Sequence, residues 1–218
     1  MSKKIGCLHA HYSNIDYIEQ ALTAYDVEFV HFVDPGLMFR YTSDENFTEA
    51  DAHQHVKEQI EWMSKCDVDA ILLTCTNYIA LLREEELSLS IPIIKIDEPY
   101  FAYLCQQQEP QLILFTNPAT VEGTIKRLDE YAKRQQKVID YRVVVIEDTF
   151  DLMMKGLQKE YSEAISNYLE EVIQSKEKTI SVAQLSMVRA AEQVSCGIIN
   201  PLQTLVSALV EQLSLKKK

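Results

Sequence analysis

The chain has 218 residues, of which 47% are hydrophobic and 25% charged, a composition typical of a globular protein with a substantial core and not of a disordered chain. Its formal net charge of −12 repels phosphate backbones and anionic lipid surfaces, so we expect neither nucleic acid nor membrane as a partner. The sequence contains no apolar run near the roughly 18 residues of a transmembrane helix, and its first residues lack the apolar stretch of a secretion signal.

The first half of the chain alternates between predicted strands and predicted helices. Short apolar or β-branched runs predict strands at residues 5–8, 27–33, 69–74 and 91–96. Apolar positions at helical spacing predict helices at about residues 14–25, 48–65, 78–87 and 98–107. The segment Asp34-Pro35-Gly36 is expected to end the second strand as a turn.

The second half repeats this alternation. Strands are predicted at residues 111–115, 138–146 and 179–183, and helices at residues 121–134, 156–174, 188–193 and 202–213. Strands that alternate with helices imply parallel strands joined by helical crossovers. Because the strands are nearly continuous apolar runs, we expect sheets that are covered on both faces. The fold class is therefore α/β and doubly wound.

The two halves also resemble each other weakly. Residues 5–9 match residues 112–116 in kind, and residues 71–76 match residues 181–186. A true repeat would give two similar lobes, with a ligand site between them at the carboxyl ends of their strands. The alternative is that any two strand–helix units look this similar.

The turn around Cys75 is the strongest candidate for chemistry. Cys75 follows a predicted buried strand and precedes a predicted helix, whose unpaired N–H groups should lower the pKa of a thiol and attract a carboxylate. Thr76 and Asn77 add uncharged hydrogen-bond donors. We therefore interpret Cys75 as a base or nucleophile that faces a small anionic substrate. The alternative is that Thr76 only caps the helix and Cys75 only fills the core.

Other polar turns supply candidate substrate-binding residues. Thr116, Asn117 and Thr120 follow the strand at 111–115 and could bind a second carboxylate. The corresponding turn of the last strand carries Gln184 and Ser186. His9 ends the first strand, and Ser13 stands at the position that matches Thr120 in the weak repeat. Each of these turns could instead be an ordinary helix start.

Spacing argues against a metal or nucleotide cofactor. The five cysteines form no Cys-x-x-Cys pair and stand at positions 7, 66, 75, 105 and 196. This pattern predicts free thiols in a reducing cytoplasm, with all but Cys75 acting as small buried hydrophobic residues. His9 and His11, like His53 and His55, lack an accompanying cluster of ligands, so we expect no metal. The five glycines stand apart from one another, whereas a phosphate-binding loop needs several close together.

The order and spacing of these segments resemble the aspartate/glutamate/hydantoin racemase superfamily over nearly the whole chain. The matching segments are Ile5-Gly6-x-x-His9-Ala10, Phe32-Val33-Asp34-x-Gly36-Leu37, Leu72-Leu73-Thr74-Cys75, Pro92-Ile93-Ile94-Lys95-Ile96-Asp97-Glu98, Thr116-Asn117-Pro118-x-Thr120 and Ala183-Gln184-Leu185-Ser186-Met187. The resemblance implies two pseudo-symmetric lobes with the active site between them, at 1–97 plus 200–218 and at 98–199. It also implies that no cofactor is used and that a homodimer is common.

The resemblance further implies a reaction at a carbon next to a carboxylate. In two-base members, one cysteine from each lobe flanks that carbon; Cys75 matches the first position, but Leu185 occupies the second and cannot carry a proton. We expect a cofactor-independent isomerase acting on a small carboxylate of the amino-acid or dicarboxylate type. Two alternatives are a one-base lyase or decarboxylase of the same fold and a non-catalytic protein that binds small acids. A scaffold or interaction protein is a further alternative.

Overall fold

The computed structural model describes residues 2–175, 179–194 and 197–218, so the expectation that Cys196 is buried concerns a residue outside the described part. The chain divides into two compact units, one of residues 1–98 with 206–218 and the other of residues 99–205. Both passages from one unit to the other lie inside helices, α5 (Asp97–Leu104) and α10 (Pro201–Gln212).

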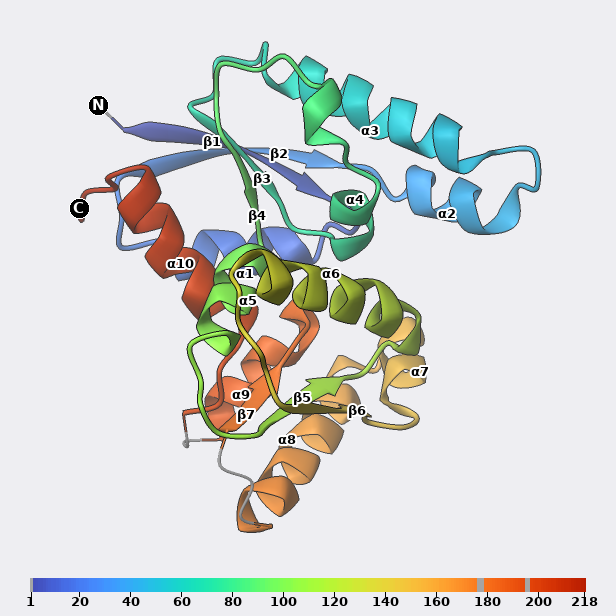
Figure 1. Ribbon diagram of the computed structural model, residues 1–218, viewed down its shortest axis with the longest axis vertical. Helices are drawn as coiled ribbons and strands as arrows, with labels where there is room; N and C mark the ends of the chain where they lie inside the picture. The colour runs from blue at the N-terminus through green and yellow to red at the C-terminus, as the bar shows by residue number, and fades with distance from the viewer. Residues whose placement is uncertain (1, 176–178, 195–196) are drawn as a thin grey trace. The chain divides into compact units, whose positions relative to one another are not determined.

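The first unit is built on a parallel sheet with the strand order β2-β1-β3-β4. Its strands are β1 (Lys3–His9), β2 (Val27–Val33), β3 (Ala70–Leu73) and β4 (Ile93–Lys95). Its helical segments are α1 (Asn14–Ala21), α2 (Gly36–Ser43), α3 (Glu49–Met63), α4 (Thr76–Ala80) and the 3-10 turn η1 (Glu84–Glu86). Helix α3 covers one face of this sheet and α1 lies on the other (Figure 1).

The second unit is built on a parallel sheet with the strand order β6-β5-β7. Its strands are β5 (Gln111–Phe115), β6 (Tyr141–Val145) and β7 (Thr179–Val182). Its helical segments, besides parts of α5 and α10, are the 3-10 turns η2 (Pro118–Thr120) and η3 (Leu185–Met187), with α6 (Val121–Arg134), α7 (Thr149–Met154), α8 (Gln158–Gln174) and α9 (Val188–Gln193).

Each face of the second sheet has its own core, because successive strand residues point to opposite sides. Leu112 and Leu114 pack with Ile165 and Leu169 of α8. Ile113 and Phe115 pack instead with residues of α5 and α6. The first sheet is equally apolar: all four residues of β3 are buried. Each fully buried aliphatic side chain of this kind contributes about 1.5–3 kcal/mol. The predicted α/β class, with two parallel sheets flanked by helices, is confirmed.

The clearest difference from the predicted elements is at Asp34-Pro35-Gly36, where the expected turn is the start of helix α2. The Asp34 carboxylate accepts hydrogen bonds from the backbone N–H groups of Gly36, at 2.8 Å, and Leu37, at 3.2 Å. Those groups would otherwise lack partners in the first helical turn, so the carboxylate stabilises the helix start. None of the helices in the described ranges is long and apolar enough to cross a membrane.

Candidate active site

The carboxyl ends of the first sheet's strands gather most of the predicted residues of the first unit. Because all four strands are parallel, their carboxyl ends lie at one edge. His9 ends β1, Cys75 follows β3 and Asp97 follows β4. Thr76 and Asn77 begin helix α4 directly after Cys75, and both are half-buried. Ser13 precedes helix α1, and its hydroxyl lies 2.8 Å from His11 Nδ1.

Cys75 is partly exposed in an extended conformation at the start of α4. Desolvation raises the pKa of its thiol, and the Asp97 carboxylate raises the pKa further. The backbone N–H groups of Tyr78 and Asn77 lower this pKa, as predicted for the start of a helix. The net pKa is nevertheless raised, because the loss of water outweighs the two amides, so the expected thiolate is not favoured. At neutral pH the group is mainly a thiol.

His9 is fully buried, and both of its ring nitrogens contact protein. Its Nδ1 lies 2.8 Å from Thr74 Oγ1 and its Nε2 lies 2.9 Å from His31 Nδ1. Burial, followed by the neighbouring His31, lowers the pKa of His9 to about 4, so the ring is neutral at pH 7. Asn14 Nδ2 also donates to Thr74 Oγ1, at 3.4 Å. His9 thus positions the residue before Cys75, while both of its nitrogens are already engaged.

In the second unit, one side chain joins three of the predicted binding residues. Gln184 Oε1 accepts hydrogen bonds from the Thr116 backbone N–H, at 2.7 Å, the Thr116 hydroxyl, at 2.9 Å, and the Asn117 backbone N–H, at 3.1 Å. Gln184 Nε2 donates to Thr120 Oγ1 at 3.0 Å. Three converging donors form a cradle for an oxygen that bears negative charge, and the amide oxygen of Gln184 fills it.

Tyr161 extends this network and was not anticipated from the sequence. Its hydroxyl lies 2.9 Å from Thr116 Oγ1 and 2.8 Å from Ser186 Oγ. Tyr161 lies in α8, where its helical spacing with Ile165 and Leu169 is typical of a core residue. Its side chain is buried. The only sequence signal was a hydroxyl on an otherwise apolar helix face. All five residues predicted for the second unit therefore belong to one hydrogen-bonded network.

Several solved protein structures are similar to this chain in fold. A Picrophilus torridus aspartate racemase superposes with a TM-score of 0.73 at 15% identity, over 100% of this chain and 96% of that one. A glutamate racemase from Francisella tularensis, solved with D-glutamate, gives 0.62 at 14% identity, over 98% and 81%. An allantoin racemase from Pseudomonas fluorescens gives 0.60 at 16% identity, over 99% and 93%. No protein-family model and no curated protein matches the sequence.

The chain has the fold of these aspartate, glutamate and allantoin racemases. Within this racemase fold, Leu185 occupies the first position of η3, directly after Gln184. It is buried at 8% exposure, and leucine offers no group that exchanges a proton. The two units of this racemase-fold protein thus differ at corresponding turns, with a thiol in one and an alkyl chain in the other.

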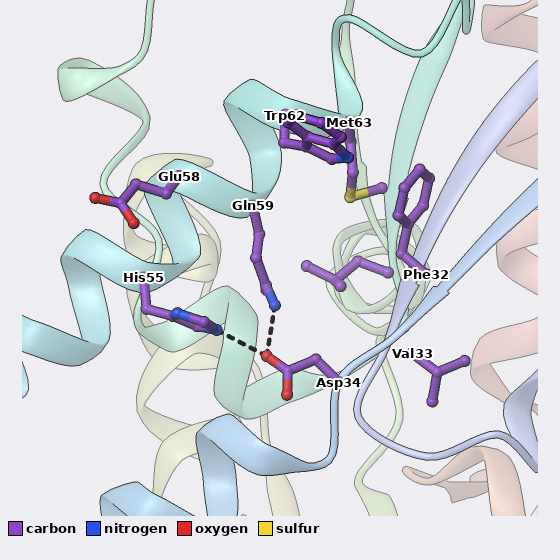
Figure 2. A pocket seen from close by; sticks show the side chains of 9 residues that line it. Phe32, Val33, Asp34, His55, Glu58, Gln59, Trp62 and Met63 are labelled. Carbon is purple, nitrogen blue, oxygen red and sulfur yellow. Dashed lines mark hydrogen bonds and ion pairs between the residues drawn. The ribbon is translucent and has the colours of Figure 1, made fainter.

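A separate pocket of about 410 Å³ lies on the α3 face of the first sheet (Figure 2). It is lined by Leu8, Phe32, Val33, Asp34, His55, Glu58, Gln59, Trp62 and Met63. His55 Nε2, 2.8 Å away, and Gln59 Nε2 both donate to Asp34 Oδ2, while Oδ1 holds the start of α2. The Asp34 carboxylate is therefore committed to protein contacts, and none of the predicted site residues lines this pocket.

Proposed function

We propose that the protein is a cofactor-independent, racemase-type isomerase that exchanges the proton on the carbon next to a carboxylate, with Cys75 as the group that moves it. The substrate would be a small amino acid or dicarboxylate. The observation that supports this most directly is a half-buried cysteine at the carboxyl end of β3, next to the first residues of a helix.

The chemistry follows from the residues around that sulfur. The thiolate of Cys75 takes the proton from the substrate carbon, and the electron pair left behind is delocalised into the adjacent carboxylate. The uncharged side chains of Thr76 and Asn77 would donate hydrogen bonds to that carboxylate, and the neutral donors favour its growing negative charge. His9 and Ser13 would support the edge of this site. In the second unit, Thr116, Asn117, Thr120, Gln184 and Ser186 would bind a carboxylate only if it displaced the Gln184 amide oxygen from the donors that now hold it.

A one-base lyase or decarboxylase is the second candidate, and two observations favour it. Leu185 provides no second proton carrier, and the raised pKa of Cys75 keeps its thiol protonated at neutral pH. When a substrate loses carbon dioxide, the electron pair of the broken bond stays on carbon. The Cys75 thiol would then protonate that carbon from one side, and the thiolate would regain its proton from water.

Proton exchange in D2O separates these candidates. Both enantiomers of aspartate and glutamate are incubated with the full chain and followed by proton NMR. Deuterium uptake from both enantiomers, with interconversion, supports the isomerase. Uptake from one enantiomer alone, or release of carbon dioxide, supports the one-base reaction. Thermal stabilisation by an acid, without exchange or turnover, would leave a non-catalytic binding protein.

We also propose the compartment, the partners and the oligomeric state of the protein. The described cysteines Cys7, Cys66, Cys75 and Cys105 are free thiols, which is consistent with a reducing cytoplasm. The strong negative charge argues against nucleic acid as a partner. A homodimer is proposed from the resemblance alone, and sedimentation of the purified chain would test it.

A further inference from the structure

Cys7, His9 and His31 meet on one face of the first sheet, beneath helix α1. Cys7 and His9 are two residues apart on β1, so their side chains point to the same side. Cys7 pairs in register with His31 of the neighbouring strand β2. The cysteine sulfur and one nitrogen of each histidine all lie within 4.8 Å of one another. Cys7 and His9 are fully buried, and the His31 side chain is 14% exposed.

These distances are close to those of a coordination sphere. Zinc binds sulfur at about 2.3 Å and histidine nitrogen at about 2.0–2.1 Å, so tetrahedral donors stand roughly 3.3–3.8 Å apart. His9 Nε2 and His31 Nδ1 are 2.9 Å apart, somewhat closer than two zinc-bound nitrogens. Since the three donor atoms lie within 4.8 Å of one another, small side-chain shifts would bring them around one ion.

The groups behind the two rings set which nitrogen of each ring carries a proton, while His9 Nε2 and His31 Nδ1 face each other. The Thr74 hydroxyl donates to the Leu8 carbonyl oxygen at 3.1 Å, so it accepts from His9 Nδ1–H and leaves the lone pair on His9 Nε2. Behind His31, the Glu19 carboxylate lies 3.4 Å from Nε2. That charge favours a proton on Nε2 and leaves a lone pair on His31 Nδ1. A carboxylate or hydroxyl behind each histidine is the usual arrangement around bound metal.

Two lone pairs that face each other at this distance repel, and a cation between or beside them removes the repulsion. A proton shared between the two ring nitrogens would remove the repulsion between the histidines. It would leave the buried Cys7 sulfur unused, with only a weak contact to the Ile5 carbonyl at 3.9 Å.

We propose that Cys7, His9 and His31 form a binding site for a thiophilic transition-metal ion of the zinc class. One sulfur and two imidazole nitrogens suit zinc and similar ions, and they do not suit magnesium or calcium, which prefer oxygen ligands. The ion would join β1 to β2 inside the first unit. Through His9 and Thr74 it would also fix the strand end that carries Cys75.

Metal content and cobalt spectroscopy of the full chain test the proposal. Because the ligands are buried, the protein is refolded with zinc or cobalt and then dialysed. The expected result is one tightly held ion per chain and, with cobalt, a sulfur-to-cobalt charge-transfer band in the near ultraviolet. Cys7→Ser should abolish this band. Glu19→Gln, which leaves all three ligands in place, should weaken zinc binding about 10- to 100-fold.

Matched controls assign the signal to this cluster. Cys66→Ser removes another thiol of the same unit, and His55→Asn removes a histidine held by Asp34; neither should change metal content or the band. Cys75→Ser should also keep the metal while it loses proton exchange, so failure of the site and failure of the proposed function are distinguishable. Metal far below one per chain, or a band that survives Cys7→Ser, would overturn the proposal. Should Cys7→Ser fail to fold, Glu19→Gln decides.

Discussion

The edges of the two sheets are constructed alike and carry different chemistry. In the first unit, the turn after β3 carries the half-buried Cys75 beside Thr76 and Asn77, which are also half-buried. In the second unit, Leu185 is buried in the turn after β7. The amide of the neighbouring Gln184 forms hydrogen bonds with Thr116, Asn117 and Thr120. The comparison teaches that a common strand–turn–helix plan does not fix the reactive group. One edge carries a thiol, and the polar groups of the other bond to one another.

The largest expected effect is at Cys75. Cys75→Ser should reduce proton exchange by about 1000-fold or more, because a serine hydroxyl is a far weaker acid and base than a thiol. The measurement is the initial rate of deuterium uptake in D2O, with an unchanged thermal unfolding curve as evidence of folding. Cys66→Ser is the matched control and should keep the full rate. Equal rates in both variants would remove Cys75 from the chemistry.

The hydrogen-bond network at the edge of the second sheet can be broken by a substitution at Gln184. Gln184→Ala leaves the N–H groups of Thr116 and Asn117 without their acceptor, which should destabilise the protein by about 1–3 kcal/mol. Chemical denaturation measures this loss. Tyr161→Phe, which removes hydrogen bonds to Thr116 and Ser186, should cost only about 1 kcal/mol. No loss in either variant would show that the network contributes nothing to stability.

The difference between Cys75 in one unit and Leu185 in the other can be removed by Leu185→Cys. A thiol at this position would supply the second proton carrier, and we expect interconversion of enantiomers to rise about tenfold relative to single-sided exchange. Chiral chromatography of the product measures it. The substitution removes buried apolar volume, so a modest loss of stability is expected. Leu185→Val, which introduces no thiol, is the control and should leave the product ratio unchanged.

The smallest expected effect concerns pH at the first edge. Since the pKa of Cys75 is raised, its thiolate is scarce at neutral pH, and alkylation by iodoacetamide should rise with pH through a midpoint above that of an ordinary thiol. Asp97→Asn removes a nearby negative charge that raises this pKa, so the midpoint should move to lower pH. Mass spectrometry of the Cys75 peptide follows the reaction. A midpoint that moves upward in Asp97→Asn would contradict the assigned cause.

Periodicity predicted the parallel sheets and the placement of Cys75, because apolar strands that end in polar turns leave little choice of fold. The sequence could not show that desolvation would outweigh the helix amides at Cys75, since burial depends on packing from distant segments. Tyr161 was missed because its helix spacing is that of a core residue. Helix α2 was missed because Asp34-Pro35-Gly36 resembles a turn until the carboxylate is seen to cap the helix.

Strand register explains the other omission. Spacing along the chain pairs His9 with His11, but in the structure His11 contacts Ser13, and His31 of another strand contacts His9. Only the pairing of Cys7 with His31 reveals this cluster. Pairing between strands depends on long-range contacts, which composition and spacing along the chain do not contain.

Successive side chains of strand β1 point to opposite faces of the sheet and therefore into two different environments. Leu8 lines the pocket beside α3, while Cys7 and His9 cluster with His31 on the opposite face. A slip of β1 by a single residue would turn the thiol and the imidazole toward Trp62 and Met63 and push Leu8 among polar groups. Misaligned pairings of this strand are therefore penalised on both faces at once, and folding is directed toward one alignment before any ligand is present.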